Sequence, residues 1–221
     1  AHPDAFQAIV NSLKLSAASV VLNLVFGLVV AYVLVRTRVK GRAILDALCM
    51  LPLAVPGLVM SFGYVAMSLQ WPFRGDLHLL GFAIPPLFPG VSVFGADPNP
   101  IPLLVCVYAV RRLPYVVRSA ASGLEQTSGE LEEAAMNLGA SRLTAVRKVI
   151  LPLIAANLIA GGLLAFSFAM LAVSEPLVMA QSPADYPITT AIYSFLTRLG
   201  DGPHIASAMG VWGMALLAVT L

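Results

Sequence analysis

The sequence predicts an all-α membrane protein, a bundle of about five transmembrane helices in a single domain over residues 1–221. Hydrophobic residues make up 59% of the chain and charged residues only 11%, whereas a soluble domain carries roughly 25% charged residues. The apolar residues are also gathered into separate runs, each near the ~20 residues that cross a bilayer. With a net charge of only +2, the chain gives no reason to expect a nucleic-acid partner.

The first two spans follow one another closely. Residues 15–35 contain no charge and form the first span, in which Gly27 belongs to a small-xxx-small pattern that lets helices approach closely in lipid. Residues 47–71 form the second span. Pro52 and Pro56 inside it should bend the helix. The bend could act as a hinge of a transport pathway, and simple helix curvature explains the two prolines equally well.

The third span begins near Ile101, after a proline-rich loop at residues 72–100. Only ten residues precede Arg111 and Arg112, so the span is either short or carries arginines at membrane depth. Ionisable side chains at depth usually face a pathway or a partner, and there the pair could attract an anionic substrate. In a short span they would instead be anchors at the inner interface.

The fourth and fifth spans are residues 153–173 and 205–221. The fourth is rich in Ala and Gly, a composition suited to tight helix packing. Glu175 follows its outer end, where it could be a gate residue, a contact for a binding protein or a solvated helix-end carboxylate. The fifth run ends at Leu221 without a charged anchor, so we expect a piece of a longer chain, with helices missing at either end possible.

Basic residues predict the orientation of these spans. Four of them lie in residues 36–42 and four more in residues 118–148, and both segments fall on the same side if the spans alternate. Cytoplasmic loops carry an excess of Lys and Arg. The sequence therefore predicts an external N-terminus and a cytoplasmic segment at residues 118–152.

This cytoplasmic segment reads as two helices joined by a turn. Thr127 with Glu130 fits a capping box that opens the first helix, and Gly139 suits the left-handed residue that ends it. Ser141 can cap a second, short helix. The basic pair at 147–148 would then lie near the carboxyl end of that helix, where the helix dipole favours cations.

Small residues give the turn a thin outer surface. Ala134, Ala135 and Gly139 leave room to enter a groove on a partner, and Glu133 offers a carboxylate to a basic side chain. From the helix signals alone, a solvated amphipathic linker explains the segment about as well.

The spacing of residues in this segment is more specific. It reads Glu133-Ala134-Ala135, three residues, Gly139, nine residues and then Val149-Ile150-Leu151-Pro152. This resembles the EAA signature of the permease subunits of binding-protein-dependent ATP-binding-cassette importers, with Val for Ile as the only departure. The residues that the resemblance assigns to ATPase docking are Glu133, Ala134, Ala135, Gly139, Leu151 and Pro152.

A finer resemblance concerns the segment around Arg111 and Arg112 and the segment at Tyr186, which look most like the ferric-iron and 2-aminoethylphosphonate branch of these permeases. The resemblance implies cytoplasmic ATP-binding subunits, a second permease half, fused or separate, and an extracytoplasmic substrate-binding protein. It also implies a multi-pass protein of the bacterial inner membrane. The substrate is not specified by these residues; ferric iron, a phosphonate or another small anion fit the branch.

No G-x-x-x-x-G-K-[ST] occurs in the sequence, so we expect no cofactor in this chain, ATP hydrolysis on a partner subunit and no enzymatic activity here. His2, His78 and His204 are scattered, and no metal site is expected. The alternative function is an ATP-independent secondary transporter or channel. Such a protein would be expected to show an inverted repeat or carboxylates near the midplane, and neither is evident.

Overall fold

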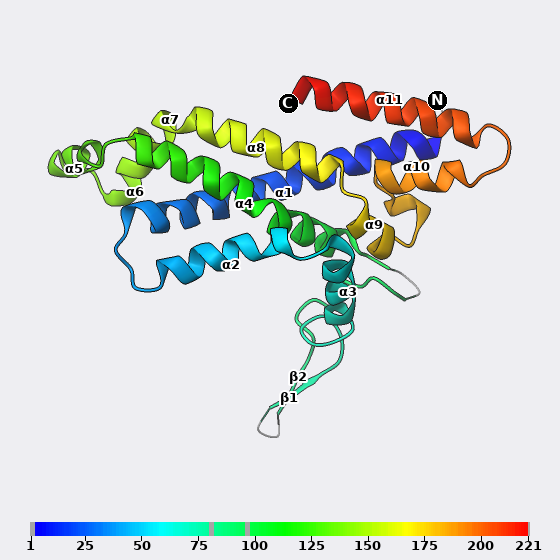
Figure 1. Cartoon of the computed structure of the whole chain (residues 1–221). Helices are drawn as coiled ribbons and strands as arrows, with labels where there is room; N and C mark the ends of the chain where they lie inside the picture. Colours follow the sequence, from blue (N-terminus) through cyan, green and yellow to red (C-terminus); the bar gives the residue numbers. More distant parts are fainter. Residues whose placement is uncertain (1–2, 80–81, 96–97, 221) are drawn as a thin grey trace. The chain divides into compact units, whose positions relative to one another are not determined.

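The computed structural model describes residues 3–79, 82–95 and 98–220, and most of them are helical (Figure 1). The longer helices are α1 (Pro3–Arg36), α2 (Arg42–Ala54), α3 (Gly57–Ser68), α4 (Ile101–Gln126), α8 (Ala155–Met170), α10 (Ile188–Leu196) and α11 (Gly202–Thr220). The shorter ones are α5 (Glu130–Asn137), α6 (Arg142–Ala145), the π turn η1 (Val146–Ile150), α7 (Leu151–Leu153), α9 (Ser174–Met179) and the 3-10 turn η2 (Pro183–Asp185). Strands β1 (Leu77–Leu79) and β2 (Phe82–Ile84) form a small antiparallel hairpin.

The predicted spans match the helices well, which confirms an all-helical membrane fold. Within the described residues, α1 and α11 are each long and apolar enough to cross a membrane. Two further spans result if α2 with α3, and Arg142–Leu153 with α8, each count as one broken span. The third predicted span corresponds to α4, which begins at Ile101 as expected.

The predicted bend of the second span is confirmed as a break between α2 and α3. Pro52 lies inside α2, whereas Pro56 stands outside both helices with an extended backbone, φ −56° and ψ 138°. The residue before a proline is pushed away from helical geometry, which here is Val55. Helix α3 then starts at Gly57.

The chain divides into two compact units, which are described separately. Unit 1 comprises the residues up to 19, 55–109 and 167 onward, and unit 2 comprises residues 20–54 and 110–166. The core of unit 1 includes Leu15, Leu104 and Tyr108, with Met179. Polar groups of α1 hold the segment before α10 in place. The Asn11 side-chain amide donates to the carbonyls of Ala184 and Tyr186 at 2.7 and 3.2 Å, and the Ser12 hydroxyl accepts from the Ile188 amide at 2.7 Å.

Unit 2 is built where α1, α4 and α8 pack around a core of Ala31, Leu124 and Ile154. Glycines allow the close approach. A Cβ at Gly27 would lie 2.7 Å from Val116 Cγ1, and one at Gly161 would lie 2.8 Å from Ser119 Cβ. The predicted tight packing of the fourth span is therefore confirmed at Gly161.

We expect Gly161→Ala to destabilise the protein, because its new Cβ would also lie 3.2 Å from the backbone Cα of Val116. Overpacking of this kind typically costs about 1–3 kcal/mol. The matched control is Gly162→Ala, whose Cβ would make only ordinary contacts, the nearest at 3.6 Å. Thermal unfolding in detergent should show a lower midpoint for Gly161→Ala alone; equal midpoints for the two variants would contradict the packing.

Candidate functional site

Helix α5 begins without the predicted capping box. Its N-cap residue is Gly129, and no side chain caps it. The Thr127 hydroxyl instead donates back to the Gly123 carbonyl at 2.9 Å, because Thr127 directly follows the last turn of α4. Ser128 takes part of the expected role, since its hydroxyl accepts from the Glu130 amide at 3.2 Å. The predicted Thr127–Glu130 capping box was therefore wrong.

The end of α5 is as predicted. Gly139 has φ +93°, the left-handed conformation that glycine adopts without strain. Its amide donates to the Met136 carbonyl at 2.9 Å, and the Ala140 amide donates to the Ala135 carbonyl at 3.1 Å. These two bonds form a Schellman motif, which satisfies carbonyls that a helix end leaves unpaired. Nothing lies within 4 Å of where a Cβ of Gly139 would be, so conformation rather than space requires glycine here.

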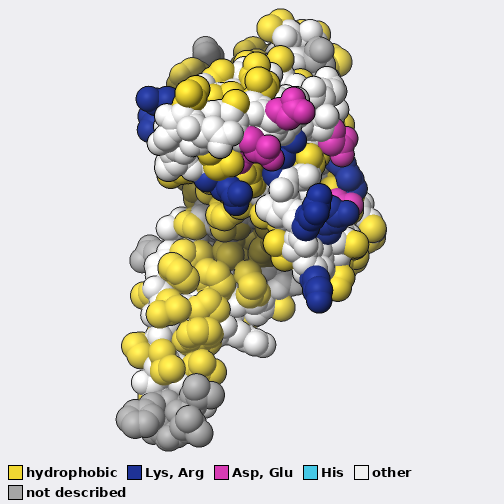
Figure 2. Space-filling view, turned by 90° about the vertical axis from the view of Figure 1, so that its left-hand side faces the viewer, with side chains coloured by type: hydrophobic (Ala, Val, Ile, Leu, Met, Phe, Trp, Pro, Cys, Tyr) yellow, Lys and Arg dark blue, Asp and Glu magenta, His cyan; other side chains and the backbone are white. Residues whose placement is uncertain are grey.

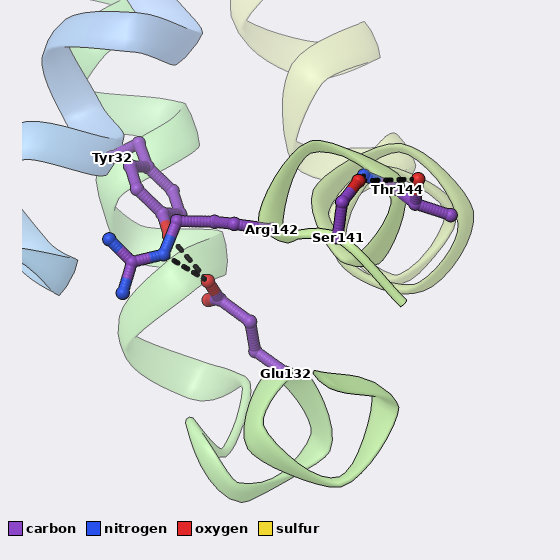
Figure 3. A network of polar contacts seen from close by, with 5 residues as sticks. All are labelled: Tyr32, Glu132, Ser141, Arg142 and Thr144. Atoms are coloured by element: carbon purple, nitrogen blue, oxygen red, sulfur yellow. Dashed lines mark hydrogen bonds and ion pairs between the residues drawn. The ribbon is translucent and has the colours of Figure 1, made fainter. Parts of the chain in front are cut away.

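The second helix starts at the predicted residue and extends further than predicted. The Ser141 side chain accepts from the Thr144 amide at 3.3 Å, which confirms the N-cap (Figure 3). The helix then continues through η1 and α7 as far as Leu153 and meets α8 at a bend of 74°. The basic pair at 147–148 therefore lies within the helix, and the prediction that it sits at a carboxyl end was wrong. No glycine or proline stands between Ser141 and Pro152 to end the helix earlier.

A polar network fastens α5 to α1 and α6. The Tyr32 hydroxyl of α1 donates to a carboxylate oxygen of Glu132, and the Arg142 Nε lies 3.9 Å from the same oxygen (Figure 3). Glu132 is only 5% exposed. One turn further along α1, Arg36 donates to the Thr127 carbonyl at 2.6 Å. Sequence reasoning missed Glu132, because only the helical rotation of 100° per residue separates it from its neighbour Glu133.

The outward side of this helix-turn-helix presents the predicted docking residues. Glu133, Ala134 and Gly139 are exposed and Ala135 is half-buried. Two large apolar side chains that were not predicted accompany them, namely Leu138 at 90% exposure and Leu143 at 78%. Figure 2 shows Lys, Arg, Asp and Glu side chains gathered on this end of unit 2. Its exposed charged residues are Arg38, Lys40, Arg42, Arg118, Glu125, Glu130, Glu133, Arg142, Arg147 and Lys148.

The last two residues of the signature lie in α7, away from the turn. Leu151 is half-buried and packs against the core of unit 2, whereas Pro152 is exposed. Leu151 thus has a packing partner within the chain. The signature therefore combines an exposed turn with residues of the helix that follows it.

The arginine pair lies in the middle of α4. Arg111 is about 15 Å along the helix from Ile101, at 1.5 Å per residue, and the helix continues from Leu113 to Gln126. Arg112 is buried at 6% exposure and Arg111 is half-buried. The helix continues past these arginines toward the segment predicted to be cytoplasmic, so both sequence-based readings of the pair, at depth or at the inner interface, remain predictions.

The remaining candidates lie apart from the helix-turn-helix in sequence. Glu175, in the first turn of α9, is 2% exposed, so the reading as a solvated carboxylate was wrong. Pro52 is half-buried in α2, and Pro56 is exposed at the break. Among the described residues, no three or more His, Cys, Asp and Glu side chains are grouped so that they could hold a metal ion.

A family model described as "Binding-protein-dependent transport system inner membrane component" matches residues 3–221. The chain belongs to this family. Membership confirms the predicted multi-pass inner-membrane location and the prediction that this chain is a membrane component of a transport system, without a cofactor of its own and not an enzyme.

Curated relatives of the chain carry several substrate names. It is 34% identical over 166 residues to the sulfate transport system permease protein CysT of Salmonella typhimurium, covering 75% of this chain and 56% of the relative. It is 34% identical over 162 residues to the molybdenum transport system permease protein ModB of Escherichia coli, covering 73% and 66%. The ferric transport system permease protein FbpB of Actinobacillus pleuropneumoniae is 28% identical over 207 residues, covering 93% and 26%. The chain thus spans between a quarter and two thirds of the length of these relatives.

Solved structures show the same fold. The MetNI methionine ABC transporter in an inward-facing conformation aligns with a TM-score of 0.68 at 16% identity, covering 97% of this chain and 90% of that chain. A bacterial ABC transporter involved in the import of alginate aligns with a TM-score of 0.66 at 17% identity, covering 100% and 77%. The helical arrangement is therefore that of the membrane domains of such transporters.

The Tyr32–Glu132 bond predicts that Tyr32→Phe loosens α5. The variant removes the hydroxyl donor and leaves a buried carboxylate with Arg142 alone at 3.9 Å, a loss worth about 1–3 kcal/mol. Hydrogen exchange at residues 130–137 should become faster by about tenfold. Tyr193→Phe, at a residue 59% exposed in α10, is the control and should leave that exchange unchanged. Unaltered exchange in Tyr32→Phe would show that the hydroxyl does not hold α5.

Proposed function

We propose that this chain is the permease subunit of an ATP-driven, binding-protein-dependent importer, and that α5 with the turn at Gly139 docks an ATPase subunit on the cytoplasmic side. The observation that carries the proposal is the exposed helix-turn-helix, in which the EAA spacing coincides with a Schellman turn at Gly139. The family, described as a component of binding-protein-dependent transport systems, supports the same activity.

Two features suit this surface to docking. Glu133 is an exposed carboxylate that can pair with a basic partner, while Leu138 and Leu143 offer exposed apolar side chains to a groove. Charged residues at the rim of an interface guide association, and buried apolar anchors supply most of the affinity. Ala134 and Gly139 have little or no side chain, so the surface between Glu133 and the two leucines stays thin. Leu151 and Pro152 then serve by holding the direction of the following helix.

The structure also offers a route from this surface into the membrane helices. Glu132 bonds to Tyr32 in α1, and Arg36 of α1 bonds to the Thr127 carbonyl in the short link between α4 and α5. Movement of α5 is therefore passed to α1 through these bonds and to α4 through the link. When ATP closes the two ATPase subunits, they would draw the docking surfaces of the two permease halves together and rock these helices so that the pathway opens outward; hydrolysis would reset it.

We further propose that the substrate is a small inorganic oxyanion. Relatives named for sulfate and molybdenum transport are each 34% identical to this chain. The mid-helix position of Arg111 and Arg112 supports an anionic substrate, since arginines at depth attract oxyanions. Ferric iron is the second candidate, because the ferric permease FbpB aligns over 93% of this chain. Delivery by an extracytoplasmic binding protein, and a second permease half that completes the pathway, are parts of the same proposal.

Replacing both Glu133 and Gly139 should abolish association with the ATPase while the spans stay inserted. We suggest Glu133→Gln with Gly139→Val, because a β-branched residue is strained at φ +93°. Co-purification of the ATPase from membranes is the measurement. Glu130→Gln, at another exposed carboxylate on α5, is the control and should retain the ATPase. Retained co-purification by the double variant would reject the docking role.

Neutralising the arginine pair separately tests the pathway. Arg111→Gln with Arg112→Gln should lower uptake of sulfate or molybdate by about tenfold or more while the complex still assembles, because each guanidinium contributes to attracting the anion. Arg118→Gln is the control in the same helix, since Arg118 is exposed and pairs with Asp46 at 3.1 Å. Normal transport by the double variant would reject the pathway role for both side chains.

A further inference from the structure

A pocket of about 230 Å³ lies between the start of α2 and the last turns of α4, beside the end of α1. Four charged side chains line it. Arg42 and Asp46 come from α2, and Arg118 and Glu125 come from α4. All four residues belong to unit 2. One cation and one anion from each helix therefore line the same pocket.

One ion pair already joins the two helices at this pocket. The Arg118 Nη2 lies 3.1 Å from the Asp46 Oδ2. The other carboxylate oxygen of Asp46, Oδ1, is buried and has no hydrogen-bond partner among the residues that the structure describes. A buried acceptor without a donor costs free energy. A further N–H donor at this point would therefore stabilise the structure.

The other two charged residues are not yet paired. Arg42 and Glu125 are both exposed, and within the described part of the chain neither side chain forms a hydrogen bond or an ion pair. Arg42 is also the first residue of α2, whose first turn contains no acidic residue. The start of a helix carries a partial positive charge, so a cation is unfavourable there unless a carboxylate lies close to it.

The course of the two helices places Arg42 and Glu125 on the same side of the existing ion pair. Figure 1 shows that α2 and α4 run in opposite directions. Arg42 lies four residues from Asp46 toward the start of α2, and Glu125 lies seven residues from Arg118 toward the end of α4. These separations are about 6 Å and about 10 Å along the axes. Residues four or seven apart share a helix face, so the two side chains can meet if the helices approach.

Helix α2 is also free to tilt. Gly41, directly before it, has φ +97°, and the break at Pro56 follows it. Within α2 the buried residue is Cys49. Segments with few buried contacts open and move at a low cost in free energy. A tilt of α2 about the Pro56 break therefore leaves the core of unit 2 in place.

We propose that the start of α2 closes onto the end of α4 by pairing Arg42 with Glu125. In the closed state the Arg42 guanidinium also donates to the Asp46 Oδ1, and the Arg118–Asp46 pair is kept in both states. An exposed ion pair shifts an equilibrium by at most about fivefold, so the two states exchange and neither is locked. Since α2 and α3 together count as one broken span, the first half of that span has two directions.

This movement goes beyond the proposed function, because it rests on the geometry of unit 2 and does not depend on ATPase docking or on the substrate. Two alanines allow it to be measured without changing the charges. Ala43 of α2 and Ala121 of α4 both line the pocket, so a disulfide between cysteines at these positions reports closure. The two native cysteines, Cys49 and Cys106, are replaced by alanine in every variant.

The test is the rate of disulfide formation in Ala43→Cys with Ala121→Cys under a mild oxidant. The full chain, purified with its associated subunits and reconstituted in nanodiscs, is digested, and the cross-linked peptide is quantified by mass spectrometry. Adding Glu125→Gln should slow the reaction by about two- to fivefold, because the closed state loses its ion pair. The matched control is Glu130→Gln, which removes an exposed carboxylate outside the pocket lining and should leave the rate unchanged.

Charge reversal distinguishes direct pairing from a general effect of charge. Glu125→Arg should slow the reaction further, because Arg42 would then face a second cation. Adding Arg42→Glu to Glu125→Arg should raise the rate again by at least about twofold, since the attraction between the two positions is restored. An unchanged rate in Glu125→Gln would overturn the proposal. The same holds if Arg42→Glu with Glu125→Arg reacts no faster than Glu125→Arg alone.

Discussion

Close approach of α1, α4 and α8 is the packing constraint on which unit 2 depends. Glycine stands where these helices meet, and a methyl group at Gly27 or Gly161 would overlap the neighbouring helix. In lipid, helices gain little from hiding apolar surface from water, so contact between their backbones and small side chains must supply the association energy. The ends of α1 and α4 are then held near one another, which lets Tyr32 and Arg36 reach the segment after α4.

The sequence predicted those helices, turns and caps that depend on a few adjacent residues. Apolar runs located α1 and α11, because a span needs only length and low charge. Gly139 and Ser141 were placed correctly, since a left-handed turn and an N-cap each depend on one residue and its immediate neighbours. The break at Pro56 followed from the same kind of reasoning.

Features that depend on contacts between residues far apart in the sequence could not be predicted in this way. Glu132 and Glu133 are identical in type and adjacent, and only the position of Tyr32, a hundred residues earlier, decides which of them is buried. The burial of Glu175 likewise depends on the packing of unit 1. Thr127 misled the capping prediction because the preceding helix offered its hydroxyl a carbonyl at Gly123. Each of these outcomes requires knowledge of which helices meet.

The π turn gives the spacing of the signature a geometric meaning. Nine residues separate Gly139 from Val149, and η1 lies across the end of that interval. A chain one residue shorter would close the turn as ordinary α-helix and rotate everything beyond it by about 100°. Ile150 and Leu151 would then leave the core, and α8 would start in a different direction. In this signature, the number of residues between the glycine and the final apolar residues therefore matters as much as the identity of the residues.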